Sequence, residues 1–227
     1  MVGYFCLPAM MAGPVPGVAV LPEAPGLGPM PRKRAELLAG MGYAALAVDL
    51  YGGGLFTGYN EEAGAHAAAM LANPALLQRR AEAGLAALAM QRYVDPARLA
   101  AIGYCLGGKA VLDSARSGIE LKGVIAYHGL LTPWAKAEPG AIAAKVLVFT
   151  GAEDPLVPLT EVAGFVNEMT TARADFCVTV YGGAGHAFTS FDVPRGTMPA
   201  KMGNFGFHAE ADREAWAATE GFLKAAF

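Results

Sequence analysis

The sequence predicts an α/β protein with an open, mostly parallel sheet that is covered by helices on both faces. Short apolar runs of strand length alternate along the whole chain with longer segments of helical pattern. These short runs are continuously apolar, which is typical of parallel strands buried on both faces. With 227 residues, of which 54% are hydrophobic, the chain is long enough to bury a sizeable core. We find no repeat, linker or composition change, and we therefore expect a single domain over residues 1–227.

The expected elements follow one another in order. The apolar start of the chain is interrupted by Pro8, Pro14 and Pro16, and we interpret it as an edge strand followed by a turn. Core strands are expected at 17–22, 43–51, 98–104, 122–129, 145–151 and 176–183. Helices are expected at 31–42, 61–72, 74–93, 106–117, 158–172 and 209–225. A connection over residues 183–208 remains, and a loop of that length in a compact domain tends to be functional.

Composition argues against several classes of protein. The net charge is −3 and no Lys/Arg run occurs, so nucleic acid is not an expected partner. The first 31 residues hold no Lys or Arg and are broken by prolines, which argues against a signal peptide and against a membrane span. Three widely spaced cysteines, Cys6, Cys105 and Cys177, predict no disulfide framework and favour a reducing cytoplasm. No spacing suits a metal, and "GLGPMP" lacks the third glycine of a dinucleotide fingerprint, so no cofactor is expected.

Cys105 lies at a corner between an expected strand and an expected helix. The stretch Gly103-Tyr104-Cys105-Leu106-Gly107 has the form of a nucleophile elbow, with Cys in place of Ser. Such a turn holds its corner residue in a strained backbone, and its flanking positions must be small to avoid collisions. The N–H groups of a helix N-terminus favour a thiolate and an oxyanion alike. The alternative is that Cys105 is a small buried hydrophobic residue, as most free cysteines are.

Residues downstream of Cys105 favour the catalytic interpretation. An elbow nucleophile is followed in the chain by an acid and then by a histidine, each after a later strand. Asp154 follows the strand expected at 145–151, and His186 follows the strand expected at 176–183, between Gly185 and Ala187. Asp154 could instead be only a turn residue, and Glu153 could be the orienting acid; we prefer Asp154 because it lies deeper in the loop.

The other histidines carry weaker signals. His66 falls within an expected helix and is interpreted as a surface or packing residue. His208 precedes the last expected helix and is a candidate cap, while His128, at the end of a strand, is a candidate pocket residue.

The sequence resembles the dienelactone hydrolase (carboxymethylenebutenolidase) family of the α/β-hydrolase superfamily. The resemblance covers essentially the whole chain and rests on "VLPEAPGLGP", "GYAALAVDLYGG", "GYCLGGKA", "GAEDPLVP" and "GAGHAF". It implies an α/β-hydrolase fold in which Cys105, Asp154 and His186 are nucleophile, orienting acid and base. It also implies that Glu23 hydrogen-bonds the resting thiol, and that the backbone N–H groups of Ala24 and Leu106 form the oxyanion hole.

The chain departs from the family pattern where the best-known members bind a substrate carboxylate with arginines. Ser190 stands at one of these positions, four residues after His186. No arginine aligns clearly with the other: Arg79, Arg80 and Arg92 are offset, and Arg195 could approach from the long connection. Hydrolysis is therefore better supported than the dienelactone substrate.

These observations predict a cysteine-dependent hydrolase of small esters or lactones that acts through a thioester acyl-enzyme. One alternative is a redox-active thiol protein or a ligand-binding homologue without turnover, although no second cysteine lies near Cys105 in the sequence. Another is an amidase or peptidase of the same fold.

Overall fold

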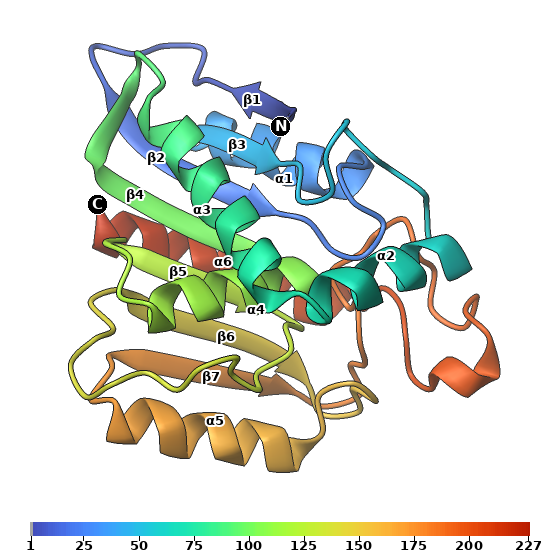
Figure 1. The fold of residues 1–227 in the computed structure, drawn as a ribbon. Coiled ribbons are helices and arrows are strands. Elements are labelled where there is room, and N and C mark those ends of the chain that lie inside the picture. The colour runs from blue at the N-terminus through green and yellow to red at the C-terminus, as the bar shows by residue number, and fades with distance from the viewer. Residues whose placement is uncertain (1) are drawn as a thin grey trace.

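A seven-stranded sheet forms the centre of the computed structural model, which describes residues 2–227. The strand order is β1-β3-β2-β4-β5-β6-β7, and only β1 runs antiparallel to its neighbour. The strands are β1 (Gly3–Cys6), β2 (Val15–Leu21), β3 (Ala44–Val48), β4 (Val94–Tyr104), β5 (Gly123–Tyr127), β6 (Lys145–Gly151) and β7 (Phe176–Tyr181). The six parallel strands therefore end at one common edge of the sheet, on the right of Figure 1. The predicted fold class is confirmed.

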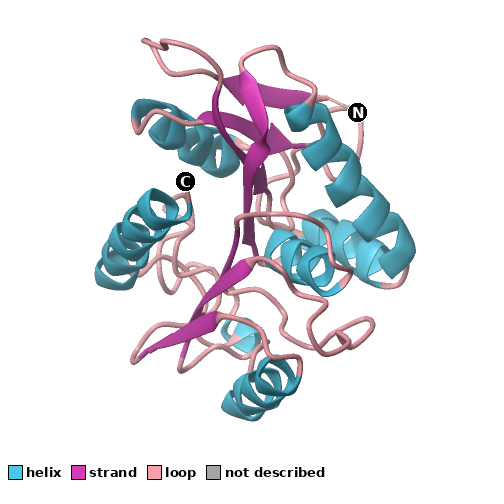
Figure 2. Ribbon diagram, turned by 90° about the vertical axis from the view of Figure 1, so that its left-hand side faces the viewer, coloured by secondary structure: helices cyan, strands magenta, loops and turns pink. Residues whose placement is uncertain are grey.

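Helices cover both faces of the sheet, as the edge-on view of Figure 2 shows. The helices are α1 (Pro29–Gly40), α2 (Glu61–Leu71), α3 (Pro74–Ala89), α4 (Leu106–Arg116), α5 (Leu159–Thr171) and α6 (Ala209–Ala226). Buried residues of α3, α4 and α5 belong to one core cluster, and buried residues of α1 and α6 belong to another on the opposite face. Two layers of helices thus shield the parallel strands from water, as the apolar strands require.

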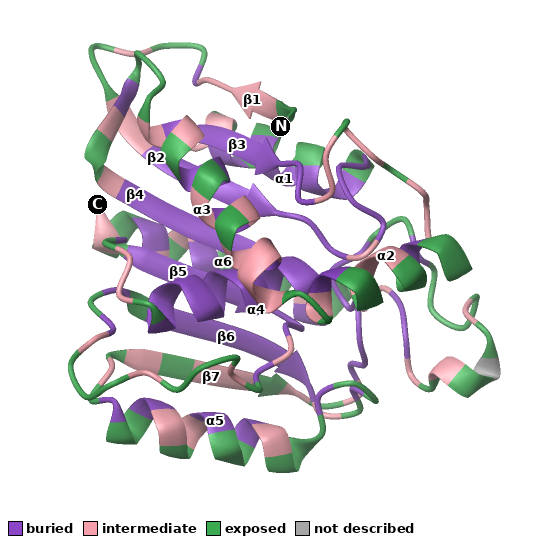
Figure 3. Cartoon of the chain, in the orientation of Figure 1, coloured by how far each residue is buried: buried purple, intermediate pink, exposed green. Residues whose placement is uncertain are grey.

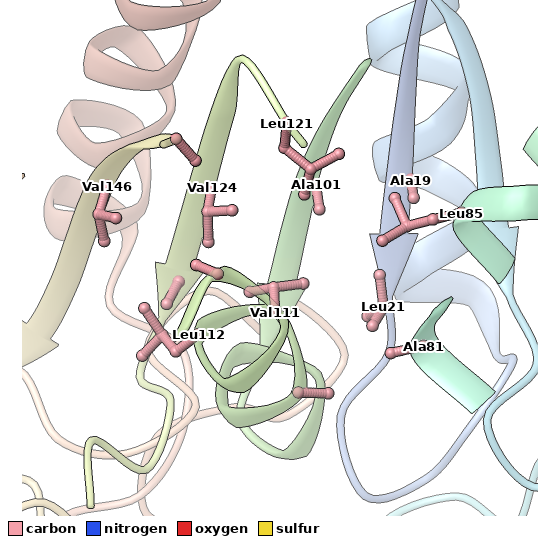
Figure 4. Close-up of a cluster of buried hydrophobic side chains, with 14 of the residues drawn as sticks. Ala19, Leu21, Ala81, Leu85, Ala101, Val111, Leu112, Leu121, Val124 and Val146 are labelled. Atoms are coloured by element: carbon pink, nitrogen blue, oxygen red, sulfur yellow. The ribbon is translucent and has the colours of Figure 1, made fainter. Parts of the chain in front are cut away.

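The core explains why the strand sequences are continuously apolar. Every residue of β3 and of β5 is buried, and purple strands run through the middle of Figure 3. On the face shown in Figure 4, Ala19 and Leu21 of β2 lie near Ala81 and Leu85 of α3, and Val124 of β5 lies near helix α4. The edge strand β7 differs, because its residues are exposed or only partly buried.

Two boundaries differ from the sequence-based expectation for one shared reason. The fourth strand begins at Val94 rather than at residue 98, and helix α3 ends at Ala89 rather than at residue 93. Val94 pairs with Val15, and the register between β2 and β4 shifts between Pro16 and Gly17. Residues 90–93, which continued the helical pattern of the sequence, form a turn instead, and the Tyr93 carbonyl accepts from the Val15 N–H at 2.9 Å. Tertiary pairing therefore overrides local propensity here.

The connection over 183–208 leaves the carboxyl edge of the sheet and contains only a short 3₁₀ helix, Ala200–Met202. Within residues 2–227, none of the helices is long and apolar enough to cross a lipid bilayer.

Candidate active site

Cys105 occupies the turn that joins β4 directly to α4. Its backbone has φ 48° and ψ −110°, a left-handed φ that is costly for a residue with a side chain. The turn is held from the neighbouring strand, because the Cys105 N–H donates to the carbonyl of Tyr127 at 3.0 Å. The strain predicted from the elbow pattern is therefore present at this residue.

The glycines around Cys105 are required by backbone packing. A Cβ atom on Gly103 would lie 2.1 Å from the carbonyl oxygen of Gly107, and one on Gly107 would lie 2.2 Å from the carbonyl oxygen of Leu21. Both obstacles are backbone atoms, which cannot swing aside as a flexible side chain can. The first turn of α4 thus lies against the end of β2, and the Gly107 N–H donates to the Pro22 carbonyl at 3.0 Å.

His186 lies between Cys105 and Asp154. Its Nε2 is 3.1 Å from Cys105 Sγ, and its Nδ1 is 2.8 Å from Asp154 Oδ2. The Asp154 carboxylate is fixed in turn, since its Oδ1 accepts hydrogen bonds from the N–H groups of Leu156 and Val157. Glu153 faces elsewhere and accepts from Asn204. The structure therefore brings together the three residues proposed from the sequence, with Asp154 rather than Glu153 beside the imidazole.

The charges of this trio favour an imidazolium at neutral pH. Burial lowers the pKa of His186, but the negative charge of Cys105 and the hydrogen bond to Asp154 outweigh it and raise that pKa from 6.5 to about 10. His186 is 1% exposed and Asp154 5%, so water screens these interactions little.

Small neighbours let the His186 loop approach the rest of the site. A Cβ on Gly185 would lie 1.9 Å from the Asn204 carbonyl oxygen, and the His186 N–H donates to that same carbonyl at 2.9 Å. The imidazole ring packs between the rings of Phe205 and His128, with centroids 5.2 and 5.1 Å away. The loop and its aromatic neighbours thereby fix the direction of the ring.

Glu23 is buried beside the trio, but its hydrogen-bond partner is Ser190. The Ser190 hydroxyl donates to Glu23 Oε2 at 2.7 Å, while the Cys105 sulfur contacts His186. Burial raises the pKa of Glu23 from 4.5 to about 7, although the hydroxyls of Tyr59 and Ser190 and the charge of His186 oppose the rise. The contact between Glu23 and the thiol that the resemblance implies is thus replaced by a contact with Ser190.

Two backbone N–H groups are available near the elbow. Neither Ala24 N–H nor Leu106 N–H has an acceptor among residues 2–227. Leu106 opens α4, where the first N–H groups of a helix lack internal partners. The bond from Gly107 to Pro22 keeps the segment carrying Ala24 beside this helix start. Both groups are therefore free to hold a developing oxyanion.

Tyr51 is a further residue of the site that the sequence reasoning did not single out. Its hydroxyl donates to the Ala24 carbonyl at 2.9 Å, and its ring lies 5.4 Å from that of His66. Burial and the nearby charge of Cys105 both raise the pKa of Tyr51, so its hydroxyl keeps its proton. The available signal was its position at the end of a strand, in the "DLYGG" segment.

The remaining candidates have clear positions. His128 is fully buried and bonded to Thr189 through Nε2, and burial lowers its pKa well below the ordinary value. His208 caps α6, as expected.

Arg195 is exposed and donates to the Gly183 carbonyl. One Arg80 guanidinium nitrogen lies 3.1 Å from where a Cβ on Gly52 would be, next to the loop that carries Tyr51. Within the described chain, no group of three or more His, Cys, Asp or Glu residues could hold a metal ion.

A mostly parallel sheet, a strained strand–turn–helix corner and a histidine and an acid on the loops after the last strands define the α/β-hydrolase class. Within that class, a sequence model of the dienelactone hydrolase family matches residues 1–227, and the chain belongs to this family.

Known proteins of similar sequence and structure agree with this assignment. A solved dienelactone hydrolase-like promiscuous phosphotriesterase from metagenomic libraries is 34% identical, with a TM-score of 0.91 over 99% of this chain and 92% of the other. A structure named m3DLH is 36% identical with the same TM-score and coverage. The Caenorhabditis elegans protein K02A2.1 is 36% identical over 154 residues, 66% of this chain and 94% of that protein. The protein is therefore an ester-hydrolysing enzyme that acts on small molecules.

Proposed function

We propose that the protein hydrolyses small neutral esters or lactones, with Cys105 as nucleophile, His186 as acid and base, and Asp154 as the acid that orients His186. The observation that carries this proposal is the contact of Cys105 Sγ with His186 Nε2 at 3.1 Å, with Asp154 behind the ring. The proposal takes residues 1–227 as one catalytic domain, in a reducing compartment that keeps Cys105 a free thiol.

In the first half-reaction, the Cys105 thiolate attacks the carbonyl carbon, and the carbonyl π electrons move onto oxygen. The N–H groups of Ala24 and Leu106 hold this oxyanion. When the carbonyl re-forms, the carbon–oxygen bond to the alkoxide breaks, and the alkoxide takes the proton from His186 Nε2. A thioester on Cys105 remains.

In the second half-reaction, neutral His186 removes a proton from water while the water oxygen attacks the thioester carbon. The second oxyanion collapses and expels the Cys105 thiolate. The acid product leaves, and the thiolate–imidazolium pair is restored. A thiolate leaves more readily than an amine, so esters and lactones suit this site better than amides.

The surroundings of Glu23 support a neutral substrate. The family members that bind a substrate carboxylate use an arginine at the position of Ser190, and Ser190 brings no positive charge. Its hydroxyl is already committed to the buried Glu23 carboxyl. A second carboxylate beside Glu23 would meet repulsion in a site that water screens weakly.

Turnover of p-nitrophenyl acetate tests the nucleophile. Cys105→Ala should abolish turnover, and Cys177→Ala, which changes an exposed thiol on β7, should leave it unchanged. Mass spectrometry of the wild type after rapid quenching should find the acetyl group on Cys105. Turnover that survives in Cys105→Ala would contradict the proposal, and alkylation of Cys105 without any turnover would favour a redox or binding role.

A matched pair of esters that differ by one carboxylate tests the substrate class. We expect the neutral ester to have the higher kcat/KM. A preference for the carboxylate-bearing ester that disappears in Arg80→Gln would instead identify Arg80 as a carboxylate-binding residue and would overturn the proposed specificity.

The similarity to a phosphotriesterase supports a second candidate activity. That relative is 34% identical over nearly all of this chain. Attack of the Cys105 thiolate on phosphorus would break the bond to the aryloxide leaving group, with the phosphoryl oxygen against the same two N–H groups. Water deprotonated by His186 would then attack phosphorus and expel the thiolate. Hydrolysis of paraoxon by the wild type, with none by Cys105→Ala, is the expected result.

A further inference from the structure

We propose that Tyr51 is a positioning residue that holds the Ala24 side of the oxyanion hole in place. The inference rests on the proposed function, because it needs Ala24 N–H to receive the oxyanion. It adds a residue on β3's exit loop to a site otherwise built from the loops after β2, β4, β6 and β7.

The loop that carries Tyr51 is rigidly folded. The buried Asp49 carboxylate accepts hydrogen bonds from the N–H groups of Tyr51, Gly52 and Gly54, at 3.1, 2.7 and 2.8 Å. Gly52 and Gly54 have φ values of 98° and 72°, which favour glycine. Three bonds to one buried acid fix the start of the loop, and they fix the direction in which the Tyr51 side chain leaves it.

The Tyr51 ring then crosses to the loop after β2. A Cβ on Gly26 would lie 3.1 Å from Tyr51 Cδ2, so the ring rests against the backbone at Gly26. Two backbone hydrogen bonds join the same loops nearby, from Leu27 N–H to the Leu55 carbonyl and from Thr57 N–H to the Pro25 carbonyl. Both bonds lie beyond Ala24, towards Gly28. Among residues 2–227, the donor that hydrogen-bonds the Ala24 carbonyl oxygen itself is the Tyr51 hydroxyl.

The position of the Ala24 carbonyl determines the direction of the Ala24 N–H. The two groups flank one α-carbon, so the φ and ψ angles of that residue set their relative orientation. Ala24 lies between Glu23, which is held by Ser190, and Pro25, whose ring removes a donor from the chain. With the Tyr51 bond, Ala24 is restrained on both sides. Without it, the residue can rotate and carry its N–H away from the oxyanion, which loses the benefit of preorganisation.

The charge near Tyr51 fits a supporting role rather than a chemical one. Burial and, to a smaller extent, the Cys105 charge raise the pKa of Tyr51, so the phenol stays protonated and its hydroxyl proton is committed to Ala24. It is therefore a poor proton acceptor for the thiol.

Tyr51→Phe tests the inference by two reactions of the same sulfur. Hydrolysis of p-nitrophenyl acetate develops an oxyanion, whereas alkylation by iodoacetamide does not. We expect kcat for the ester to fall by about tenfold or more with little change in KM, since loss of a whole oxyanion donor costs about 10²–10³ in kcat. The alkylation rate of Cys105 should stay at the wild-type value. Tyr4→Phe, which removes a hydroxyl bonded to Glu36 at the surface, is the matched control and should change neither rate.

Ala24→Gly provides a second variant that leaves the phenol intact. Glycine frees the backbone at residue 24, so it should also lower kcat, and the combined Tyr51→Phe/Ala24→Gly variant should lose less than the product of the two single losses. If the loss of kcat in the double variant equals the product of the two single losses, Tyr51 does not act through Ala24, and the inference is contradicted.

Each outcome has a separate meaning. Unchanged kcat in Tyr51→Phe, or an equal fall in ester hydrolysis and alkylation, would overturn the inference. Cys105→Ala is measured alongside; if it retained turnover, the proposed function would fail, whatever Tyr51→Phe did. If Cys105→Ala is inactive while Tyr51→Phe behaves as wild type, only the role of Tyr51 is refuted.

Discussion

Replacing Glu23 by glutamine tests the electrostatic description of the buried site. Glu23 is 3% exposed, and its hydrogen bond comes from a neutral hydroxyl, that of Ser190. No Lys or Arg within residues 2–227 forms an ion pair with it. Burial is the largest cause of the rise of its pKa from 4.5 to about 7. The folded protein therefore binds this proton more tightly than the unfolded chain does.

The size and sign of the effect follow from linkage. A pKa that rises from 4.5 to about 7 makes folding more favourable by about 3 kcal/mol when Glu23 is protonated than when it is ionised. This contribution is fully present below pH 4.5 and is lost as the pH rises through about 7. Glutamine has nearly the same shape and does not titrate. The free energy of unfolding of Glu23→Gln minus that of the wild type should therefore increase by about 2–3 kcal/mol between about pH 5 and pH 8.5.

Urea denaturation of both proteins at half-unit steps of pH measures this difference. Glu36→Gln, which makes the same substitution at a half-exposed carboxylate on α1, is the matched control. A flat curve for Glu23→Gln would refute the reasoning, because it would mean that Glu23 has the same pKa in the folded and unfolded states.

Two further predictions concern the elbow and a buried arginine. Gly107→Ala should lower the free energy of unfolding by several kcal/mol and abolish activity, because its Cβ would lie 2.2 Å from a backbone oxygen. Gly164→Ala, in open space on α5, is the control and should raise the free energy of unfolding by about 0.5–1 kcal/mol; urea denaturation measures both. Arg34→Met should lower stability by about 3 kcal/mol because Asp212 loses its buried partner, whereas Lys33→Met on the surface should change it by less than about 1 kcal/mol; calorimetry compares the two.

The order of strands and helices was predictable because each element carries its own periodicity. Even the continuous apolar runs at β3 and β5 indicated burial on both faces. The start of β4 was not predictable, because Val94 joins the sheet through its pairing with Val15, and no local pattern encodes that pairing. Helix propensity near residues 90–93 and sheet pairing compete there, and the pairing prevails.

The trio of candidate catalytic residues was accessible to sequence reasoning because chain order and strand ends already bring it together. Cys105, Asp154 and His186 each follow a strand of the parallel sheet, and such strands end at one edge. The partner of Glu23 was not accessible, because Ser190 lies 167 residues away and only the packing of two loops joins them. The hydrogen bond of the Tyr51 hydroxyl was not predictable for the same reason, because its acceptor is a carbonyl in another loop.

The crowding at the Cys105 corner has a practical consequence for laboratory evolution of this enzyme. Gly103 and Gly107 meet main-chain atoms of neighbouring elements, so random replacement there mostly yields unfolded chains. The segment from Phe191 to Pro199 is largely exposed and leaves the same edge of the sheet. Libraries that keep the corner fixed and vary this exposed segment should therefore retain a much larger fraction of folded variants than libraries spread over the whole gene.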